Sequence, residues 1–576
     1  MKFSVLALDY DGTIARDSKT HVTIADAIRD ARRQGIVLVL VTGRVLSDLR
    51  WLLNGQDLFF DVIVAENGAV IEYSNGRTRK FGGPPPQGFL DELAQLKVGF
   101  RLGDCVVEAD ASAAPEILEL ITKLQLPLTL TLNRSRVMVL PQGITKATGL
   151  RETLKTLRLS LHNCIGIGDA ENDYPLLDAC EIGVAVGWGS SSLKKIADDV
   201  LEGPWPEAIA DYIRRVAGQR KLPPNRVDSQ HILLGHTGKH EPIETVVRGY
   251  NVLVAGDPRS GKSWITGLIC EQLILNEYCL CVIDPEGDYA TLESLPNVVV
   301  FGGDDRPPRW RDVERMVRYP DVSMVIDLSR LDHEKKAAYI TELLPKLASL
   351  RRHTGLPHWI VVDEAHYFLE DCRTEPPVDL DLASYLFITY RPSQLCSELV
   401  ETLGSVIATR CTDPGEVKAL ATISGGDGLK SDWATLLGSL EIGEAALLSG
   451  VDWLDHVPQR FTTAQRITMH VRHRAKYLDV PMPKRNAFVF TDQARPVSTP
   501  ARTLEQFVTA VELLPIATID GHAKRGDFSR WIGEVFGDQP LAVAIGQVEE
   551  QYRLGHVADL AKELVSPIRE RYELGQ

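Results

Sequence analysis

The sequence predicts an α/β protein made of two successive parallel-sheet units with a small helical domain after them. Short apolar runs alternate with helical stretches from residue 1 to about 215, and the alternation returns from 228 to about 475. This is the pattern of doubly wound parallel sheets. From about 502 the apolar spacing is mostly helical. At 576 residues the chain is too long for one hydrophobic core, so several domains are expected.

The composition, 44% hydrophobic and 24% charged, is that of an ordinary soluble protein. No window offers the roughly 18 to 20 apolar residues of a membrane span, and the N-terminus lacks the features of a signal peptide. We therefore expect a cytoplasmic protein without membrane contact. The nine cysteines are scattered without a C-x-x-C pair, so we expect them to be reduced. A net charge of -15 argues against a broadly basic nucleic-acid surface but leaves room for a local basic channel.

The elements follow from the apolar runs. In the first unit, strands are expected at Val5–Leu8, Val37–Val41, Val62–Ala65, Cys164–Ile167 and Gly183–Val186. In the second, they are expected at Asn251–Ala255, Leu280–Ile283, Val298–Phe301, Ser323–Leu328 and Trp359–Val362. A proline-rich interruption at 84–86 predicts a small separate cap at about 83–140. Polar, proline-bearing stretches predict linkers, so the expected domains are 1–215, 228–478 and 502–576, joined by linkers at 216–227 and 479–501.

Two carboxylates follow the first expected strand. Asp9 and Asp11 are two residues apart on the carboxyl edge of a parallel sheet, where ligands bind. One carboxylate can attack a phosphoryl group while the other gives a proton to the leaving alcohol. The alternative for this short motif alone is a capped turn.

Three further segments favour the catalytic interpretation. Thr42 and Gly43 follow the second strand and can hold phosphate oxygens. Lys146 can neutralise the phosphate and the charge that develops on it. Asp169 and Asp173 lie at another strand end, where carboxylates supply the hard oxygen ligands that Mg²⁺ prefers.

With these four segments in this order, residues 1–215 resemble the haloacid dehalogenase superfamily, in its Cof-like branch of sugar and phosphoglycolate phosphatases. The resemblance implies a Rossmann-like core with a small cap. It implies that Asp9 is the nucleophile and an Mg²⁺ ligand, and that Asp11 is the general acid/base and a ligand. By the same resemblance, Asp169 and Asp173 complete the ligand set, and Thr42 and Lys146 hold the phosphate.

The second unit carries a complete G-x-x-x-x-G-K-S motif between a strand and a helix. Its backbone amides form an anion nest, Lys262 can reach the outer phosphates of ATP, and Ser263 can ligate Mg²⁺. The nucleotide-binding residues expected from this P-loop are Gly256, Asp257, Pro258, Arg259, Ser260, Gly261, Lys262 and Ser263. About a hundred residues later, Asp363 fits the Walker B aspartate and Glu364 a base that orients the attacking water.

Residues 228–475 resemble the HerA-FtsK family of ring ATPases, through Ile283–Tyr289 and Thr389-Tyr390-Arg391-Pro392. The resemblance implies an ATP site between subunits and a homo-oligomer, with a hexamer the usual number. Arg391 and Arg410 are candidate arginine fingers, and each also fits an ordinary salt bridge. Two features depart from the family: Tyr390 replaces the usual sensor glutamine, and the first unit stands where the family has a small β-barrel.

We therefore expect a bifunctional enzyme, an Mg²⁺-dependent phosphatase fused to a ring-forming ATPase that acts on nucleic acid or is regulated by it. The expected substrates are ATP and either a small phosphate ester or a nucleic-acid end, with DNA as a candidate partner. Two alternatives remain open. One is a polynucleotide end-processing kinase/phosphatase. The other is a phosphatase whose second unit is a nucleotide-gated scaffold without turnover.

Overall fold

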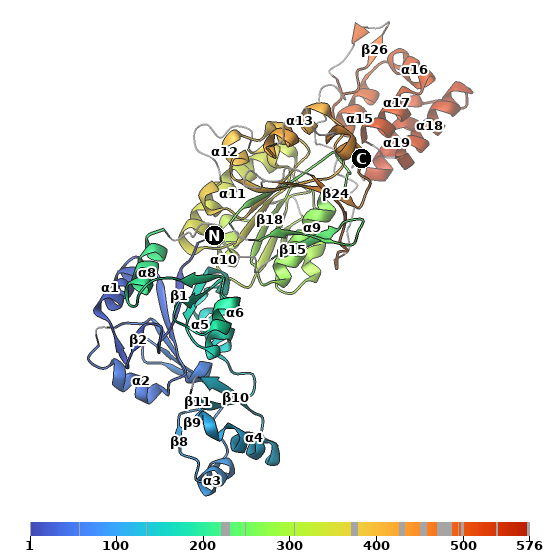
Figure 1. Ribbon diagram of the computed structural model, residues 1–576. Coiled ribbons are helices and arrows are strands. Elements are labelled where there is room, and N and C mark those ends of the chain that lie inside the picture. The colour runs from blue at the N-terminus through green and yellow to red at the C-terminus, as the bar shows by residue number, and fades with distance from the viewer. Residues whose placement is uncertain are drawn as a thin grey trace.

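The computed structural model describes most of the chain. The described residues are 2–56, 58–133, 135–219, 231–247, 249–303, 306–369, 378–425, 433–449, 458–468, 487–492, 495–496, 500–536 and 539–572. The expected linkers at 216–227 and 479–501 lie partly outside them. Three bodies follow one another along an elongated molecule, with the cap at one end and the C-terminal helices at the other (Figure 1). The α/β fold class is confirmed.

The first body is built on a sheet of mostly parallel strands. Its order is β14-β13-β12-β1-β4-β5-β6-β7. The strands are β1 (Val5–Asp9), β4 (Val37–Val41), β5 (Val62–Ala65), β6 (Val70–Tyr73), β7 (Thr78–Lys80), β12 (Cys164–Gly168), β13 (Ile182–Val186) and β14 (Asp199–Leu201). The strands from β14 to β5 run parallel, so the carboxyl ends of β1, β4 and β12 meet at one edge.

Alternate residues of these strands bury opposite faces of the sheet. Leu6 and Leu8 pack into the core on the side of α1 (Val22–Arg33) and α8 (Glu207–Gln219). Val5 and Ala7 pack into the core on the other side, which is covered by α5 (Lys146–Leu157), α6 (Tyr174–Ala179) and α7 (Ser191–Ile196). The period of two along each buried strand is what places helices on both faces.

The cap is a second, antiparallel sheet with two helices. Its order is β10-β11-β9-β8, and its elements are α3 (Gln87–Gln95), β8 (Phe100–Leu102), β9 (Val107–Asp110), α4 (Ala114–Lys123), β10 (Leu128–Asn133) and β11 (Arg136–Pro141). Val137 and Val139 pack toward the cap helices. Met138 and Leu140, on the opposite face, pack with Val45 and Leu46 of the core. The same alternation therefore turns one face of the cap toward the phosphatase-like core.

The second body contains an 11-stranded sheet of order β16-β15-β25-β24-β23-β17-β22-β21-β18-β20-β19. Its strands are β15 (His231–His236), β16 (Pro242–Val246), β17 (Asn251–Ala255), β18 (Leu280–Asp284), β19 (Val298–Gly302), β20 (Ser323–Asp327), β21 (Trp359–Val362), β22 (Tyr385–Thr389), β23 (Leu403–Ala408), β24 (Glu444–Ser449) and β25 (Gln459–Thr463). The strands from β23 to β19 are parallel. The larger helices are α9 (Lys262–Leu275), α10 (Trp310–Val317), α11 (His333–Thr354) and α13 (Pro414–Ile423). They lie on both faces of the sheet.

The third body is a helical C-terminal domain. Its helices are α15 (Leu504–Leu513), α16 (Ile516–Arg525), α17 (Asp527–Trp531), α18 (Gln539–Arg553) and α19 (Leu560–Tyr572). Phe488 and Phe490 fall within the expected linker, yet both are buried in the core of this domain. Their rings lie 5.5 and 5.7 Å from that of Phe507. Aromatic burial therefore extends the domain into the proline-rich stretch.

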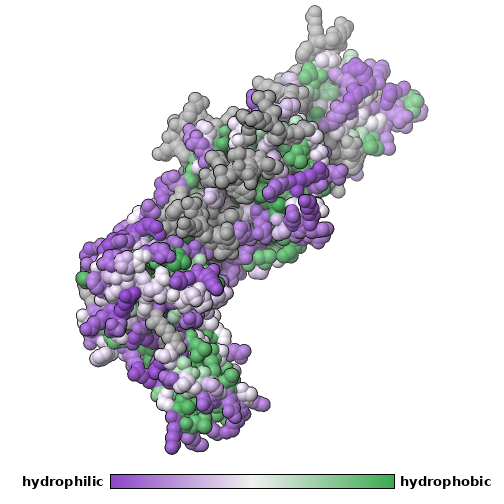
Figure 2. All heavy atoms as spheres, viewed as in Figure 1, coloured by the Kyte–Doolittle hydropathy of each residue, from purple (hydrophilic) through white to green (hydrophobic). Residues whose placement is uncertain are grey.

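In the view of Figure 2 the visible face is largely hydrophilic, and apolar side chains gather on the cap. Within the described residues, every helix is too short or too polar to cross a bilayer.

Cys396 is disulfide-bonded, so the expectation of reduced thiols is wrong for this residue. Seven other cysteines are free and buried, in line with the scattered pattern.

Candidate active sites

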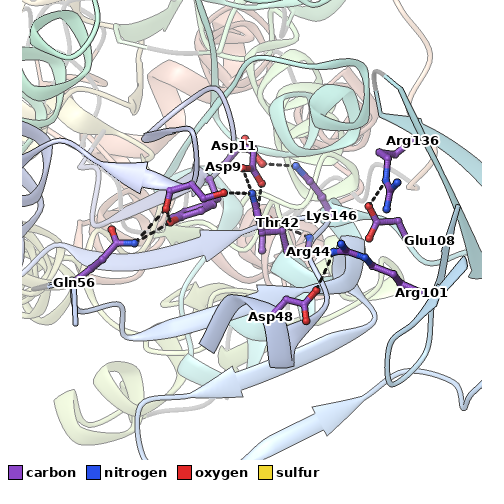
Figure 3. Close-up of polar contacts among 12 residues, drawn as sticks. Asp9, Asp11, Thr42, Arg44, Asp48, Gln56, Arg101, Glu108, Arg136 and Lys146 are labelled. Carbon is purple, nitrogen blue, oxygen red and sulfur yellow. Dashed lines mark hydrogen bonds and ion pairs between the residues drawn. The ribbon is translucent and has the colours of Figure 1, made fainter. Parts of the chain in front are cut away.

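Four predicted residues of the first unit meet in a buried cluster at the carboxyl edge of its sheet. The Lys146 Nζ atom lies 2.6 Å from Oδ1 of Asp9 and 2.5 Å from Oδ1 of Asp173. Asp9, Asp169 and Asp173 can each offer an oxygen within 4.8 Å of the others. All four side chains are buried. Three segments far apart in sequence therefore bring three carboxylates around one ammonium group (Figure 3 shows Asp9 and Lys146).

Local hydrogen bonds fix the direction of these carboxylates. Oδ2 of Asp173 accepts the backbone N–H groups of Asp169 and Ala170, at 2.9 and 3.0 Å. Its other oxygen is left for Lys146. The Thr13 hydroxyl donates to Oδ1 of Asp169 at 3.4 Å. The turn after β12 thus presents one oxygen of Asp173 to the cluster.

The electrostatics of the cluster fit a divalent cation. Burial, with the nearby charge of Asp173, raises the pKa of Asp9 well above its ordinary value, although Lys146 opposes this. Burial lowers the pKa of Lys146, but the charges of Asp173 and Asp9 outweigh it and hold that pKa above the ordinary value. Counted as ionised, the three carboxylates exceed the one ammonium group by two negative charges in a buried site. Carboxylate oxygens are the ligands that Mg²⁺ prefers, so Asp9, Asp169 and Asp173 suit this ion in both charge and donor type.

The Asp11 side chain lies outside this cluster. Both of its oxygens accept from Arg44, at 2.5 Å from Nε and 2.5 Å from a terminal nitrogen (Figure 3). The hydrogen bond to Asp11 is the main cause that raises the pKa of Arg44. Among the described residues, the carboxylates close enough together to share one metal ion are those of Asp9, Asp169 and Asp173. The carboxylate of the expected ligand Asp11 therefore does not lie among them.

Thr42 and Gly43 form a tight turn after β4, beside two asparagines. The Thr42 hydroxyl accepts the backbone N–H of Arg44 at 3.2 Å. A Cβ on Gly43 would lie 3.2 Å from Oδ1 of Asn67 and 3.6 Å from Nδ2 of Asn172. Asn172 donates to Asn67 at 3.2 Å. The sequence analysis gives neither asparagine a role, although Asn172 lies between Asp169 and Asp173.

The loop that carries Asp9 and Asp11 is held by two tryptophans. The indole N–H of Trp188 donates to the carbonyl of Gly12 at 2.8 Å, and that of Trp205 donates to the carbonyl of Thr13 at 3.1 Å. The Arg16 guanidinium lies 5.0 and 4.8 Å from the two ring centroids. Nothing in the motif itself predicts these contacts, because they come from segments 176 and 192 residues away.

The cap adds two charged pairs near the site. Arg136 Nε lies 2.7 Å from Glu108 within the cap sheet, and Arg101 lies 3.5 Å from Asp48 of α2 (Leu46–Leu53). Figure 3 shows both pairs beside Arg44. The side of the cap that faces the core therefore carries arginines, each of which has a carboxylate partner.

The P-loop of the second unit joins β17 to α9. The Lys262 ammonium donates to the loop carbonyls of Gly256 and Asp257, at 3.1 and 2.8 Å. The Ser263 hydroxyl donates to Oδ2 of Asp288 at 2.6 Å. The Ser260 hydroxyl lies 2.5 Å from that of Thr409. Lys262, expected to meet phosphate, is thus held by carbonyls of the loop. Ser263, expected to meet the metal, is held by an acidic side chain.

The rest of the loop is supported by the segment after β23. The Asp257 carboxylate accepts the backbone N–H and the hydroxyl of Thr412, at 3.0 and 2.7 Å. The Asp257 N–H donates to the carbonyl of Arg410 at 2.7 Å. The Arg410 and Arg259 side chains are exposed, and Pro258 and Arg391 are half-buried. Arg410 therefore follows a strand adjacent to the P-loop, and its backbone supports that loop.

Asp363 and Glu364 follow β21, as expected for a Walker B pair. Both are buried, and Glu364 has a positive φ of 50°. Oε2 of Glu364 lies 3.6 Å from Nδ1 of His366, which is 3.0 Å from the Thr389 hydroxyl. The Tyr390 hydroxyl, in the position expected for a sensor, lies 3.3 Å from that of Tyr367. Glu364 is thus surrounded by aromatic and histidine side chains of two neighbouring segments.

Two family models match the chain. The model described as haloacid dehalogenase-like hydrolase matches residues 6–81 and 92–213. The model described as Helicase HerA, central domain, matches residues 254–353. The second match includes the P-loop but ends before Asp363 and Glu364.

Curated relatives match the first unit over nearly their whole length. "Phosphoglycolate phosphatase 2" of Saccharolobus solfataricus is 27% identical over 219 residues, which is 37% of this chain and 91% of the relative. "Phosphoglycolate phosphatase" of Methanothrix thermoacetophila is 30% identical over 229 residues, 37% of this chain and 97% of the relative. A crystal structure of a haloacid dehalogenase-like hydrolase from Bacteroides thetaiotaomicron is 21% identical, with a TM-score of 0.34, and covers 37% of this chain and 100% of its own. The N-terminal part of this chain belongs to the haloacid dehalogenase-like hydrolases, and it is fused to a HerA central domain.

Proposed function

We propose that the N-terminal unit is an Mg²⁺-dependent phosphomonoester phosphatase that works through a covalent intermediate on Asp9. The observation that carries the proposal is the buried cluster in which Lys146 bridges Asp9 and Asp173 beside Asp169. Buried clusters of this kind, with an excess of carboxylates, are typical of sites built for a phosphoryl group and its metal.

The proposed reaction has two displacements at phosphorus. In the first, an Asp9 oxygen attacks phosphorus, the bond from phosphorus to the ester oxygen breaks, and the leaving alkoxide takes a proton from Asp11. In the second, water gives a proton to Asp11 and attacks phosphorus, the bond to Asp9 breaks, and inorganic phosphate leaves. Lys146 and the turn at Thr42 and Gly43 hold the phosphate oxygens throughout.

Asp9, Asp169 and Asp173 would hold the Mg²⁺ ion. When bound, the ion would offset the charge of the carboxylates and of the phosphoryl oxygens. Asp11 serves in the proton transfers, since its carboxylate lies outside the cluster.

We propose a small phosphomonoester with a second anionic group as the substrate class. Arg44, Arg101 and Arg136 lie around the site and each has a carboxylate partner. A substrate carboxylate suits the same guanidinium groups. Two of the relatives are named phosphoglycolate phosphatases, and phosphoglycolate belongs to this proposed class of substrates. The cap that faces the core is short, which favours a small ester over a nucleic-acid end.

For the second unit we propose ATP hydrolysis. Lys262 and Ser263 would meet the outer phosphates and their Mg²⁺, Asp363 would act as the Walker B aspartate, and Glu364 would orient the attacking water. Arg391 or Arg410 would serve as an arginine finger between subunits of a ring, with DNA as the candidate partner. The match to a HerA central domain and the contacts within the P-loop support this proposal.

Two other functions make different predictions. An end-processing kinase/phosphatase would transfer phosphate to a nucleic-acid hydroxyl and would not need Glu364. A nucleotide-gated scaffold would bind ATP without turnover. The buried place of Glu364 directly after Asp363 favours water as the acceptor. Loss of ATP hydrolysis in Glu364→Gln, with ATP binding retained, would exclude both alternatives.

The first experiment is phosphate release, with Mg²⁺, from ATP and from a panel of phosphate esters and 3′- and 5′-phosphorylated DNA ends. Wild type is compared with Asp9→Asn and Lys262→Ala, and with the controls Asp211→Asn and Lys346→Ala, whose side chains form exposed pairs within helices. We expect Asp9→Asn to lose ester hydrolysis alone and Lys262→Ala to lose ATP hydrolysis alone. Unchanged activities in both variants would refute both sites.

A further inference from the structure

The carboxylate of Asp11 has a single cation on both of its oxygens. Arg44 approaches one oxygen through Nε and the other through a terminal nitrogen, each at 2.5 Å. The same terminal nitrogen donates to the Ser18 hydroxyl at 3.0 Å, and the guanidinium lies 5.5 Å from the centroid of the Tyr10 ring. A fork of this kind holds a carboxylate in one orientation. The proposed proton donor is therefore held by a residue of another loop.

Arg44 stands between the reacting groups and the cap. Its backbone N–H is bonded to the Thr42 hydroxyl, which belongs to the turn proposed to hold phosphate. The charge of Glu108, on the cap, adds a small contribution to the raised pKa of Arg44. Glu108 itself is paired with Arg136 at 2.7 Å. A ligand held between that turn and the cap would therefore lie close to the Arg44 guanidinium.

The geometry of the pair matches that of a carboxylate ligand. A planar guanidinium binds one carboxylate through two parallel N–H···O bonds, and a substrate carboxylate offers the same two oxygens as Asp11. Only one of these two carboxylates can accept both of the parallel N–H groups of Arg44. Substrate and Asp11 therefore compete for Arg44.

We propose that Arg44 is a positioning residue that holds the ionised Asp11 carboxylate until the second anionic group of the substrate takes its place, which frees Asp11 to take up a proton from water and deliver it to the leaving oxygen. This inference rests on the proposed phosphatase function and deepens it. Recognition of the anion is thereby coupled to the readiness of the proton donor. An ester without such a group binds its phosphate but leaves Asp11 paired, and its alkoxide departs without a proton.

The test compares three esters as probes: 2-phosphoglycolate, ethyl phosphate and p-nitrophenyl phosphate. The first two differ by a carboxylate in place of a methyl group, and the third has a leaving group that needs little proton transfer. In wild type we expect kcat/KM for 2-phosphoglycolate to exceed that for ethyl phosphate on the order of 100-fold. In Arg44→Ala this ratio should fall to about 5-fold or less, because 2-phosphoglycolate loses its site while Asp11 becomes free.

The direction of change with ethyl phosphate decides the matter. We expect its kcat to rise in Arg44→Ala, whereas kcat/KM for 2-phosphoglycolate falls. A parallel loss with all three esters would overturn the proposal, because it would mean that Arg44 serves only to bind phosphate or to hold the fold. An unchanged ratio would overturn it as well.

Two further variants keep the test sharp. Arg44→Lys keeps the charge but lacks the fork, so we expect a low substrate ratio together with a wild-type thermal unfolding temperature. Arg50→Ala is the matched control, since Arg50 forms a similar pair with Glu72 outside the site, and its substrate ratio should equal that of wild type. Ester hydrolysis retained by Asp9→Asn would refute the phosphatase function itself, an outcome distinct from any result at Arg44.

Discussion

The ring of His162 stacks on the ring of Tyr278 across the boundary between the phosphatase-like unit and the HerA-like unit, with 3.7 Å between centroids. Glu181 accepts from both, at 2.7 Å from Nδ1 of His162 and 3.0 Å from the Tyr278 hydroxyl. Asn163 and His358 extend the contact, 3.3 Å apart. The two units therefore share a buried polar and aromatic junction.

The junction predicts that Tyr278 stabilises the docking of the two units. Tyr278 is buried, so Tyr278→Ala removes a large packed ring and should lower the free energy of unfolding by about 3 to 5 kcal/mol. Tyr278→Phe loses only the bond to Glu181, at about 1 kcal/mol. Calorimetry and limited proteolysis of the full chain measure both effects. Tyr174→Ala, at a half-exposed ring, is the control, and equal behaviour of the two alanine variants would contradict the prediction.

The excess of carboxylates predicts that Mg²⁺ stabilises the first unit. A cation that binds only the folded state raises the unfolding temperature as its concentration rises. In wild type we expect an upward shift of the first transition with millimolar Mg²⁺, reversed by a chelator. Asp169→Asn should lose most of that shift and be more stable without metal, because it removes one of the crowded charges. An Mg²⁺ shift as large in the variant as in wild type would count against the site.

The P-loop predicts a difference between two of its glycines. Gly256 has φ +151°, and a Cβ there would lie 2.1 Å from the Thr409 hydroxyl oxygen. Gly261 has φ +104° but has no heavy atom within 4 Å of such a Cβ. Both alanine variants carry backbone strain of about 1 to 3 kcal/mol, but only Gly256→Ala adds a clash. Urea unfolding and ATP binding should show the larger loss for Gly256→Ala, and equal losses would contradict the clash.

The environment of His366 predicts that the stability of the HerA-like unit is sensitive to acid. Burial lowers its pKa to about 4, against an ordinary value of about 6.5. Between these values the unfolded chain binds a proton that the folded chain does not, so stability falls as the pH drops from about 6.5 to about 4. Above about 6.5 this residue has no such effect. Over that pH window, the unfolding temperature of His366→Gln should change less with pH than that of wild type. An equal dependence on pH in the two proteins would refute the assignment.

Much of this structure could be predicted from the sequence, because strand ends and loop motifs are local. The residues around Asp9 follow buried strands, and parallel strands must bring their carboxyl ends to one edge. The P-loop is specified by eight consecutive residues. The expected strands at Val5–Leu8 and Asn251–Ala255 lie where the structure has β1 and β17.

The rest depends on contacts between distant segments. The Arg44 side chain pairs with Asp11, and no spacing in the sequence shows which carboxylate an arginine will choose. The tryptophans that hold the Asp9 loop come from residues 188 and 205. The proline-rich composition predicts a linker at Phe488 and Phe490, whereas their burial against Phe507 places them in the C-terminal domain. Such pairings arise only once the chain is folded.

The junction also determines which way the two candidate sites face. Asn163, Tyr278 and His358 stand at the amino ends of β12, β18 and β21, while Asp169, Asp284 and Asp363 stand at or just beyond the carboxyl ends. Two strands of five residues, at about 3.3 Å per residue, put roughly 30 Å of sheet between the two sites. They open toward opposite ends of the molecule. A small product of one proposed reaction would thus have to travel roughly 30 Å to reach the other candidate site.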